Sequence, residues 1–286
     1  FERDAKAPRP ELGSLHEPGR DIPVYRQCDV LVVGGGPSGT AAAAAAAAAG
    51  ADVVLLERYN HLGGLASGGM VLVLDDMNNG QEVTVTGLCM EMIERMARVG
   101  ACVYPPEEDR RQGWDTYRRW ASWGLFDFRT DTKPNAIVMA AAFDPDGWKR
   151  VSNDMIEEAG VDVRLHSWFS RTVMEGNRAT GVICETKQGR QAIMGEVVID
   201  ATGDLDVAAA AGAPFVHGSY ILTTVFRLGG VDTDAAERFA LEEPETYARI
   251  DRQAKRIMGG SWDFWWLKTP LPGIVWCNCP HMTGLD

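Results

Sequence analysis

Three glycines near the N-terminus have the spacing Gly-x-Gly-x-x-Gly, at Gly34, Gly36 and Gly39. An apolar stretch at 28–33 precedes them and predicts a buried strand, and residues 37–49 predict a helix. In this context Gly34 permits a tight turn, Gly36 lets backbone approach a pyrophosphate, and Gly39 lets helix and strand pack closely. The free N–H groups at the helix N-terminus favour phosphate. The pattern predicts a dinucleotide site; the alternative is a glycine-rich turn that binds no ligand.

A second apolar stretch, 52–57, follows the helix and ends in Glu57. Strand, helix and strand in this order predict a βαβ unit with parallel strands. A carboxylate at Glu57 can accept hydrogen bonds from a ribose diol and disfavours a 2′-phosphate, so NADP is not expected. The intervening helix contains nine consecutive alanines, 41–49. Alanine has the best helix propensity, and methyl groups on the buried face allow close packing against a sheet.

Charge and composition restrict the possible partners. The 286-residue chain carries 28 Lys and Arg against 40 Asp and Glu, a net charge of −12, which disfavours nucleic acid. No apolar run is long enough to predict a membrane span. Of six cysteines only Cys277 and Cys279 lie close together, so neither a metal site nor a disulfide scaffold is expected. Free thiols favour a reducing, cytoplasmic location.

The remaining chain alternates between helical and strand patterns. Residues 1–27 predict an extended arm, and residues 61–70 a glycine-rich loop. Residues 101–135, which hold three tryptophans, predict an irregular cap. Helices are predicted at 86–100, 144–160, 204–211 and 233–258, and further strands at 161–166, 168–175, 179–186, 191–203 and 223–232. The tail, 261–286, combines tryptophan with proline and glycine and predicts no regular element.

Three ordered motifs resemble a known family. These are CDVLVVGGGPSG with its acidic strand end ER and the loop HLGG, then FDPDGWKRVSNDMIEEAGVDVRLHSW, then GEVVIDATGD. Together they resemble the FAD-dependent oxidoreductases of the two-dinucleotide-binding type, in particular a family related to fumarate reductase and succinate dehydrogenase flavoproteins. The resemblance implies an α/β, Rossmann-like doubly wound FAD-binding domain with a β-meander, formed by 28–75 and 143–216. It also implies an inserted cap, 76–142, and a partial α+β substrate domain, 217–286.

The resemblance also implies a role in FAD binding for each matching residue. Gly34, Gly36, Pro37, Ser38 and Gly39 would contact the pyrophosphate and Glu57 the adenosine ribose, while Arg58, Gly63 and Gly64 would border the ribityl and pyrophosphate; Ser67 and Gly68 would approach the isoalloxazine, Phe169 would meet the adenine through its backbone, and Thr202, Gly203 and Asp204 would close over the pyrophosphate. The alternative for the last three is a strand-to-helix turn in which Asp204 caps the helix.

The implied reaction is hydride transfer between a small organic substrate and N5 of the flavin. His281 is a candidate acid/base and Arg227 a candidate ligand of a substrate carboxylate; the alternatives are a structural histidine and a surface ion pair. His61 lies near the position, though not at the offset, where some relatives attach flavin covalently, and the alternative is an ordinary loop histidine. No Gly-x-Ser-x-Gly or His-Glu-x-x-His motif indicates a hydrolase.

One element of the family pattern is missing from the sequence. Relatives have a later glycine-rich segment that completes the flavin pocket, and none follows Asp204 here. We therefore expect a companion chain or C-terminal fragment to complete the site in a hetero-oligomer, and expect the chain alone to bind FAD poorly. The alternative from another functional class is a non-catalytic dinucleotide-binding subunit of a larger complex.

Overall fold

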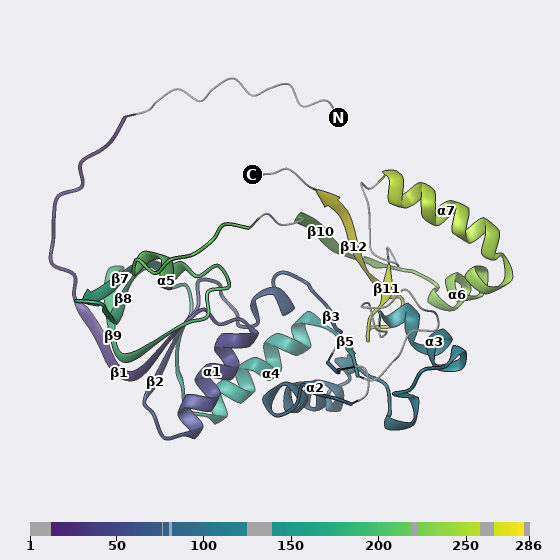
Figure 1. The fold of residues 1–286 in the computed structure, drawn as a ribbon, viewed down its shortest axis with the longest axis horizontal. Helices are drawn as coiled ribbons and strands as arrows, with labels where there is room; N and C mark the ends of the chain where they lie inside the picture. Colours follow the sequence, from purple (N-terminus) through teal and green to yellow (C-terminus); the bar gives the residue numbers. More distant parts are fainter. Residues whose placement is uncertain are drawn as a thin grey trace.

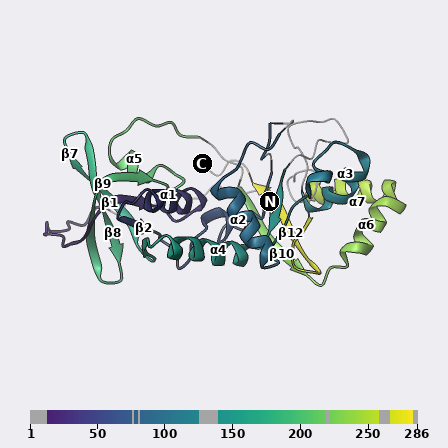
Figure 2. The same cartoon turned by 90° about the horizontal axis from the view of Figure 1, so that it is seen from below.

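The computed structural model describes residues 13–75, 77–79, 82–124, 139–218, 222–257 and 266–282. The molecule is elongated (Figures 1 and 2). A six-stranded sheet lies at one end, helices α1 (Pro37–Ala48) and α4 (Pro145–Glu158) extend from it, and helices α6 (Thr233–Glu242) and α7 (Pro244–Ile257) form the other end.

The six-stranded sheet has the strand order β6-β2-β1-β9-β8-β7. Strand β1 is parallel to β2 and β9, and β2 is parallel to β6. Strands β7, β8 and β9 form an antiparallel meander. The bounds are β1 Val24–Val33, β2 Val53–Leu56, β6 Asp162–Arg164, β7 Trp168–Glu175, β8 Arg178–Thr186 and β9 Gly189–Asp200. The predicted α/β, Rossmann-like fold with a β-meander is confirmed.

The alanine tract lies between the sheet and a second helix. Ala43 and Ala44 of α1 are buried in a cluster with Val32 and Val53 of the sheet and with Ile156 of α4. Small side chains therefore let α1 approach two neighbours at once. Ala45, Ala48 and Ala49 are exposed, and there good helix propensity is the remaining reason for alanine. The prediction of methyl-sized packing holds for the buried face.

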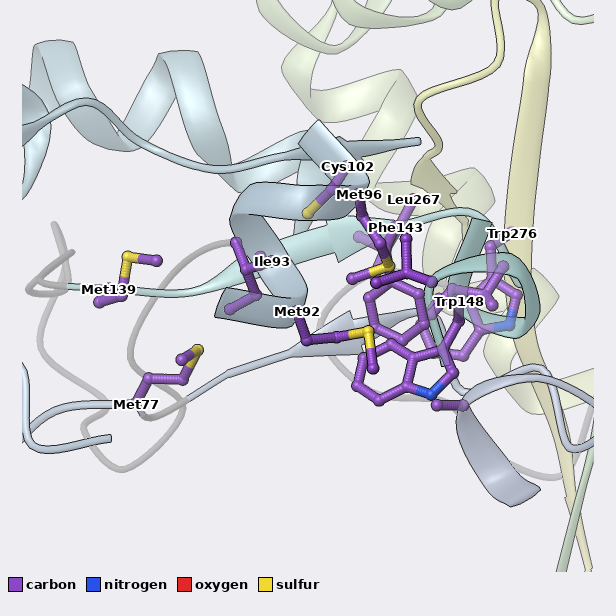
Figure 3. Packing of buried hydrophobic residues seen from close by; sticks show 14 of the residues in the cluster. Met77, Met92, Ile93, Met96, Cys102, Met139, Phe143, Trp148, Leu267 and Trp276 are labelled. Carbon is purple, nitrogen blue, oxygen red and sulfur yellow. The ribbon is translucent and has the colours of Figure 1, made fainter. Parts of the chain in front are cut away.

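A second core lies beyond α4 and is rich in methionine and aromatic residues (Figure 3). Phe143 and Trp148 pack with ring centroids 4.8 Å apart, beside Met92 and Met96 of helix α2 (Leu88–Arg98). A small antiparallel sheet with the order β3-β5-β4 borders this core. Its strands are β3 Val73–Leu74, β4 Cys102–Val103 and β5 Ala141–Phe143. The sequence pattern did not predict this sheet, because strands of two or three residues show no periodicity.

The third sheet contains a strand in the tail for which no element was predicted. Its order is β10-β12-β11, with β10 Leu222–Gly229, β11 Leu267–Lys268 and β12 Ile274–Met282. A single helix was expected over 233–258, but the chain forms two helices there, α6 and α7. The break between them falls at Glu243, because the next residue is a proline. Helix α5 spans Asp206–Ala210, so the helix expected from residue 204 begins later.

Two further segments differ from expectation. Strand β1 begins at Val24, so the last residues of the predicted arm belong to the sheet. The described part of the predicted irregular cap holds helix α3 (Trp114–Trp120) and two short 3-10 helices, Glu107–Asp109 and Ala121–Trp123; a third short 3-10 helix is Gly64–Ala66. None of the helices in the described ranges combines the length and apolar character that a membrane crossing requires.

Candidate cofactor site

The carboxyl ends of three parallel strands meet at one edge of the six-stranded sheet. The backbone N–H of Ala201, after β9, donates to the carbonyl of Val33 at 2.8 Å, and that of Gly34 donates to the carbonyl of Leu56 at 2.8 Å. A cavity of about 790 Å³ lies at this edge. Its size falls in the range of ligand sites, and this edge is where open α/β sheets bind their ligands.

The glycine turn forms one wall of the cavity, and its three glycines differ in role. Gly34 has a φ of +103°, and a Cβ there would overlap the backbone of Ala201. A Cβ on Gly39 would overlap the carbonyl of Gly34. At Gly36 the nearest atom to an added Cβ is Gly64 Cα at 3.9 Å. Gly34 and Gly39 are thus required by the fold itself, whereas Gly36 leaves space on the cavity wall.

Helix α1 begins at this turn with its N-terminal donors free for a ligand. Its N-cap is Gly36, which supplies no side-chain cap within the described chain, and Pro37 occupies the first helical position. The N–H groups of the first turn have no intrahelical partner and concentrate the positive end of the helix dipole. Since Pro37 and Ser38 line the cavity, this end of α1 suits the phosphates of a dinucleotide.

Glu57 connects the glycine turn with the next part of the cavity wall. Its side chain is buried, with 5% exposed. Oε2 accepts from the Gly35 N–H at 2.7 Å, and Oε1 accepts from the Tyr59 N–H at 2.8 Å. These bonds fix the carboxylate in the cavity wall, and each oxygen keeps a second acceptor site for a ribose hydroxyl.

Beyond Glu57 the wall consists of Arg58 and two aromatic rings. The Arg58 guanidinium carbon lies 4.9 Å from the ring centroid of Tyr59 and 5.6 Å from that of Trp168. The two rings meet edge-on with centroids 6.4 Å apart. Arg58 was predicted as a cofactor contact, but Tyr59 and Trp168 were missed. The sequence offered one indication of their role, because each is the neighbour of a predicted cofactor contact. Tyr59 follows Arg58, and Trp168 precedes Phe169.

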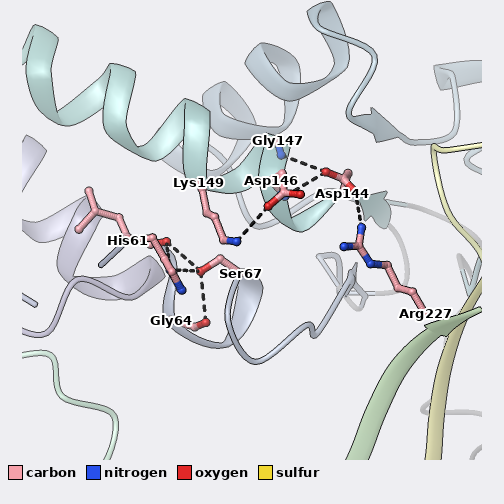
Figure 4. Close-up of polar contacts among 9 residues, drawn as sticks. His61, Gly64, Ser67, Asp144, Asp146, Gly147, Lys149 and Arg227 are labelled. Carbon is pink, nitrogen blue, oxygen red and sulfur yellow. Dashed lines mark hydrogen bonds and ion pairs between the residues drawn. The ribbon is translucent and has the colours of Figure 1, made fainter. Parts of the chain in front are cut away.

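The loop after β2 lies beside the glycine turn, and Figure 4 shows its polar contacts. Ser67 is 1% exposed and donates from Oγ to the Leu62 carbonyl at 2.8 Å. His61 Nδ1 lies 3.1 Å from the same carbonyl and 3.2 Å from Ser67 Oγ. Gly63 has a φ of +107°, and a Cβ there would approach Ser67 Oγ to 2.6 Å. Ser67 and Gly63 therefore shape the loop, while His61 lines the cavity.

The ATGD turn completes the wall after β9. Asp200 Oδ1 accepts from the N–H and hydroxyl of Thr202 at 3.1 and 2.7 Å, and Oδ2 accepts from the Ala208 N–H at 2.9 Å. Thr202 Oγ1 in turn accepts from the Asp206 N–H at 3.0 Å. The alternative in which Asp204 caps the following helix is wrong, because the N-cap residue is Leu205 and it offers no side-chain bond.

Most residues predicted from the family resemblance lie together around this cavity. Those that line it are Gly34, Gly36, Pro37, Ser38, Glu57, Arg58, Gly64, Gly68, Phe169, Thr202, Gly203 and Asp204. Three predicted residues, Gly39, Gly63 and Ser67, do not line the cavity. Gly39 packs inside the glycine turn, and Gly63 and Ser67 pack inside the loop after β2. His61, the candidate for covalent attachment, also lines the cavity, and the lining residues that were not predicted are Val33, Leu56, Tyr59, Leu65, Gly69, Ser167, Trp168, Ala201 and Asp206.

The two catalytic candidates lie in the third sheet. Arg227 of β10 does not line the cavity; its Nη1 forms an ion pair with Asp144 Oδ2 at 3.0 Å (Figure 4). The ion pair agrees with the alternative role predicted for Arg227, that of a surface ion pair. It differs in one respect, since the Asp144 carboxylate is nearly buried. The backbone of His281 lies in β12 opposite Thr223, and its side chain lies outside the described part of the structure.

The charges of the lining residues restrict how phosphates can be held. Arg58 is a cation in the wall, and Glu57, Asp204 and Asp206 are acids. Phosphate charge must therefore be met by the backbone N–H groups of the turn, by the dipole of α1 and by Arg58. These groups fit the pyrophosphate of FAD. Among the described residues, no group of three His, Cys, Asp or Glu side chains is arranged to hold a metal ion.

Comparisons with known proteins agree with this geometry. A family model described as FAD dependent oxidoreductase matches residues 29–284. Similar solved structures include p-nitrophenol 4-monooxygenase from Pseudomonas putida DLL-E4 (TM-score 0.51, 12% identity, covering 90% of this chain and 58% of that one). Others are glycerol-3-phosphate dehydrogenase from Bacillus halodurans complexed with FAD (0.49, 14%, 92% and 49%) and L-proline dehydrogenase from P. horikoshii (0.48, 16%, 74% and 62%).

The likeness to p-nitrophenol 4-monooxygenase concerns the fold alone. The chain spans between 49% and 62% of the length of the three solved structures. No curated protein matches the sequence.

Proposed function

Because this chain belongs to the family of FAD dependent oxidoreductases and its cofactor is accordingly FAD, we propose that it takes part in hydride transfer between a small organic substrate and N5 of the flavin. The observation that supports this proposal most strongly is the cavity at the carboxyl ends of β1, β2 and β9. It brings residues from three separate family motifs onto one wall. The flavin, when bound, supplies the redox chemistry, and the chain supplies binding and orientation.

The order of groups along the wall supports one proposed arrangement of the dinucleotide. The turn at Gly36 and Ser38 with the N-terminus of α1 would hold the pyrophosphate, and the fixed carboxylate of Glu57 would accept the ribose hydroxyls. Thr202 and Asp204 would close over the pyrophosphate from the other side. The loop around Gly68 would then border the isoalloxazine.

We also propose that further polypeptide covers the flavin end of the cavity. Leu65 lines the cavity and is 70% exposed, and Leu205, which stands between two lining residues, is 54% exposed. Apolar side chains at the mouth of a binding site are suited to contact with another chain or segment. A companion of this kind would bring further acid/base and substrate-binding groups to the flavin, beside the candidate His281 of β12.

Two measurements on the native material test the proposal: an absorbance spectrum and the intact mass. We expect flavin bands near stoichiometric occupancy when any companion is present, and bleaching of those bands under anaerobic addition of a reducing substrate. A mass increase equal to FAD after denaturation would show covalent attachment, for which His61 is the candidate on the cavity wall. Flavin that stays oxidised with every class of donor tested would favour the non-catalytic subunit instead.

A further inference from the structure

We propose that one edge of strand β10 is a docking site, where an extended segment of the companion polypeptide adds a strand to the third sheet. The inference rests on the companion proposed above for the mouth of the cavity. It gives that companion a second surface and a mode of contact. The edge concerned is the side of β10 that points away from β12, and it is called the open edge below.

Within the described part of the chain, β10 has a neighbouring strand on one side only. The third sheet has the order β10-β12-β11, so β10 is a terminal strand, and it spans the eight residues Leu222–Gly229. In an antiparallel pair, alternate N–H and carbonyl groups point toward the neighbour and the others point away. A row of such outward groups is a template for pairing with another strand.

The open edge lacks the features that protect a terminal strand from pairing. Proteins protect such strands with lysine, proline or charged side chains along the edge. The sequence of β10 is LTTVFRLG, without lysine or proline. Its one charged side chain, Arg227, is held in the ion pair with Asp144. The composition of β10 is therefore that of an interior strand rather than of a protected edge.

The two faces of β10 are covered to different degrees. Val225 packs against the second core, and Arg227 forms its ion pair on the same face, since side chains alternate along a strand. On the opposite face Leu222 and Leu228 are each 47% exposed, and Phe226 is 39% exposed. One face of β10 is thus used by the fold, and the other presents three large apolar side chains to solvent.

The exposed face of β10 continues a surface that is buried over β12. Phe226 lies opposite Cys277, and Leu228 lies opposite Val275. Cys277 and Val275 are buried in a cluster with Trp266. The cover over this face therefore ends between β12 and β10. The side chains of an added strand would extend it over Phe226 and Leu228 as cross-strand neighbours.

Exposed apolar side chains also lead from the cofactor region toward β10. In the segment that follows α5, Phe215 is 50% exposed and Val216 is 93% exposed. Figures 1 and 2 show this green segment on the outside of the molecule, apart from helices α1 and α4. Leu205, at the mouth of the cavity, precedes it in the chain. A polypeptide that covers the mouth and continues along β10 would bury all of these side chains, which suits an interaction surface.

Length and charge favour a companion over a second copy of this chain as the occupant. This chain covers 58% of the solved structure with a similar fold, p-nitrophenol 4-monooxygenase, so that fold accommodates further polypeptide. A second copy would bring another net charge of −12 to the contact, and like charges oppose association. Pairing of two β10 strands would also leave Leu205 and Phe215 uncovered.

Hydrogen exchange of the native material at single-residue resolution tests the proposal, with native mass spectrometry of the same sample. We expect slow exchange for the N–H groups of β10 that point to either side, because both edges are paired. An open edge would leave about half of them, in alternation, exchanging fast. The mass should show one further polypeptide bound to each chain.

Substitutions on the exposed face test the contact itself. The double variant Phe226→Lys with Leu228→Lys gives the strand the charge of a protected edge. It should retain the companion at least tenfold more weakly and restore fast exchange at alternate residues. Phe226→Leu should stay within about threefold of wild type. The control is Leu241→Lys, at a leucine of α6 that is 65% exposed, and it should retain the companion like wild type. Thermal melts show whether each variant is folded.

Several results would overturn the added strand. Fast exchange at alternate residues of β10 in the native material is one, and wild-type retention of the companion by the folded double lysine variant is another. Slow exchange throughout β10 in a sample with the mass of one chain or of two copies is a third, because the strand would then come from this chain itself. Flavin that is reduced in single-chain material would leave the proposed function intact while the strand proposal fails. A bound companion strand beside flavin that is never reduced would show the reverse.

Discussion

Asp144 and Arg227 form an ion pair, 3.0 Å between Oδ2 and Nη1, that joins the N-terminus of α4 to strand β10. The Asp144 side chain is 9% exposed and the Arg227 side chain 30% exposed. Asp144 Oδ1 also accepts from the N–H groups of Asp146 and Gly147 at 2.9 and 3.2 Å, and so caps the helix. One carboxylate thus starts a helix of the cofactor region and holds a strand of the third sheet.

The two roles of Asp144 can be separated by substitution. Asp144→Ala removes the cap and the ion pair and should lower the free energy of unfolding by about 2–4 kcal/mol, since a cap alone is worth about 1 kcal/mol. Asp144→Ser keeps a capping oxygen and should cost about half as much. Arg227→Met should add little to Asp144→Ser, because the pair is already broken. Urea denaturation of the single and double variants measures these values; equal losses for Ala and Ser would contradict the capping role.

The glycine turn allows folding and binding to be tested apart. Gly36→Ala should keep a melting temperature close to wild type, because φ is −71° there and the nearest atom to the new Cβ is 3.9 Å away. The same variant should weaken FAD binding by about tenfold or more, because the new methyl group blocks the approach of the phosphate. Gly39→Ala should lose both stability and binding, since its Cβ would overlap the Gly34 carbonyl. Thermal melts and flavin titration distinguish these outcomes.

The control for this pair is Gly229→Ala, because nothing lies within 4 Å of an added Cβ there and Gly229 is not one of the residues that line the cofactor cavity. It should leave flavin affinity unchanged. Wild-type affinity in Gly36→Ala would show that the cofactor does not approach the turn at this residue.

The sequence predicted the parts of the site that depend on local geometry. The strand–turn–helix at Gly34–Gly39 and the acid at Glu57 follow from spacing, because a turn of this type requires glycine at fixed positions. The small sheet of β3, β4 and β5 and the strand β12 could not be predicted. Their strands are stabilised by pairing between distant segments, such as Leu74 with Ala141, and short or aromatic-rich segments carry no period of their own.

The contact between Tyr59 and Trp168 shows the same limit for the site. Tyr59 and Trp168 are more than one hundred residues apart in sequence. They meet only because the segment after β2 and the segment before β7 exchange backbone hydrogen bonds. Asp200 is a similar case: its carboxylate orders the ATGD turn through Thr202, although the sequence pattern favoured Asp204.

Substitution of Glu57 by glutamine should weaken both the turn and cofactor binding. The carboxylate accepts from one N–H with each oxygen, whereas the amide has a single acceptor oxygen and would point its NH₂ group at the other N–H. A buried N–H left without a partner costs about 1–3 kcal/mol, so Glu57→Gln should lower the unfolding free energy by that amount. Flavin titration should show weaker binding as well, because the same group is proposed to hold the ribose. Unchanged stability would show that the two N–H groups find other acceptors.

Cys102 should make the protein less stable at alkaline pH. Its side chain is 6% exposed in the second core, and burial raises the pKa of the thiol to about 12. In the unfolded chain the thiol loses its proton near pH 8.5 to 9, and this ionisation stabilises the unfolded state. The stabilisation that the buried thiol gives the folded state is therefore fully present below that pH. It is lost progressively as the pH rises toward 12. Cys102→Ala removes this titration. The stability advantage of wild type over Cys102→Ala should therefore shrink by about 1.4 kcal/mol per pH unit above pH 9.

Urea denaturation at pH 8 and pH 10 measures this change, with Ile93→Val as a control in the same core. Ile93→Val deletes a methylene from a fully buried side chain and should cost about 1 kcal/mol at both pH values, because no proton is involved. A pH-independent difference for Cys102→Ala as well would mean that the thiol ionises equally easily in the folded and unfolded chain. The second core would then have to admit water or a cation beside Cys102, contrary to its packing against Met96 and Phe143.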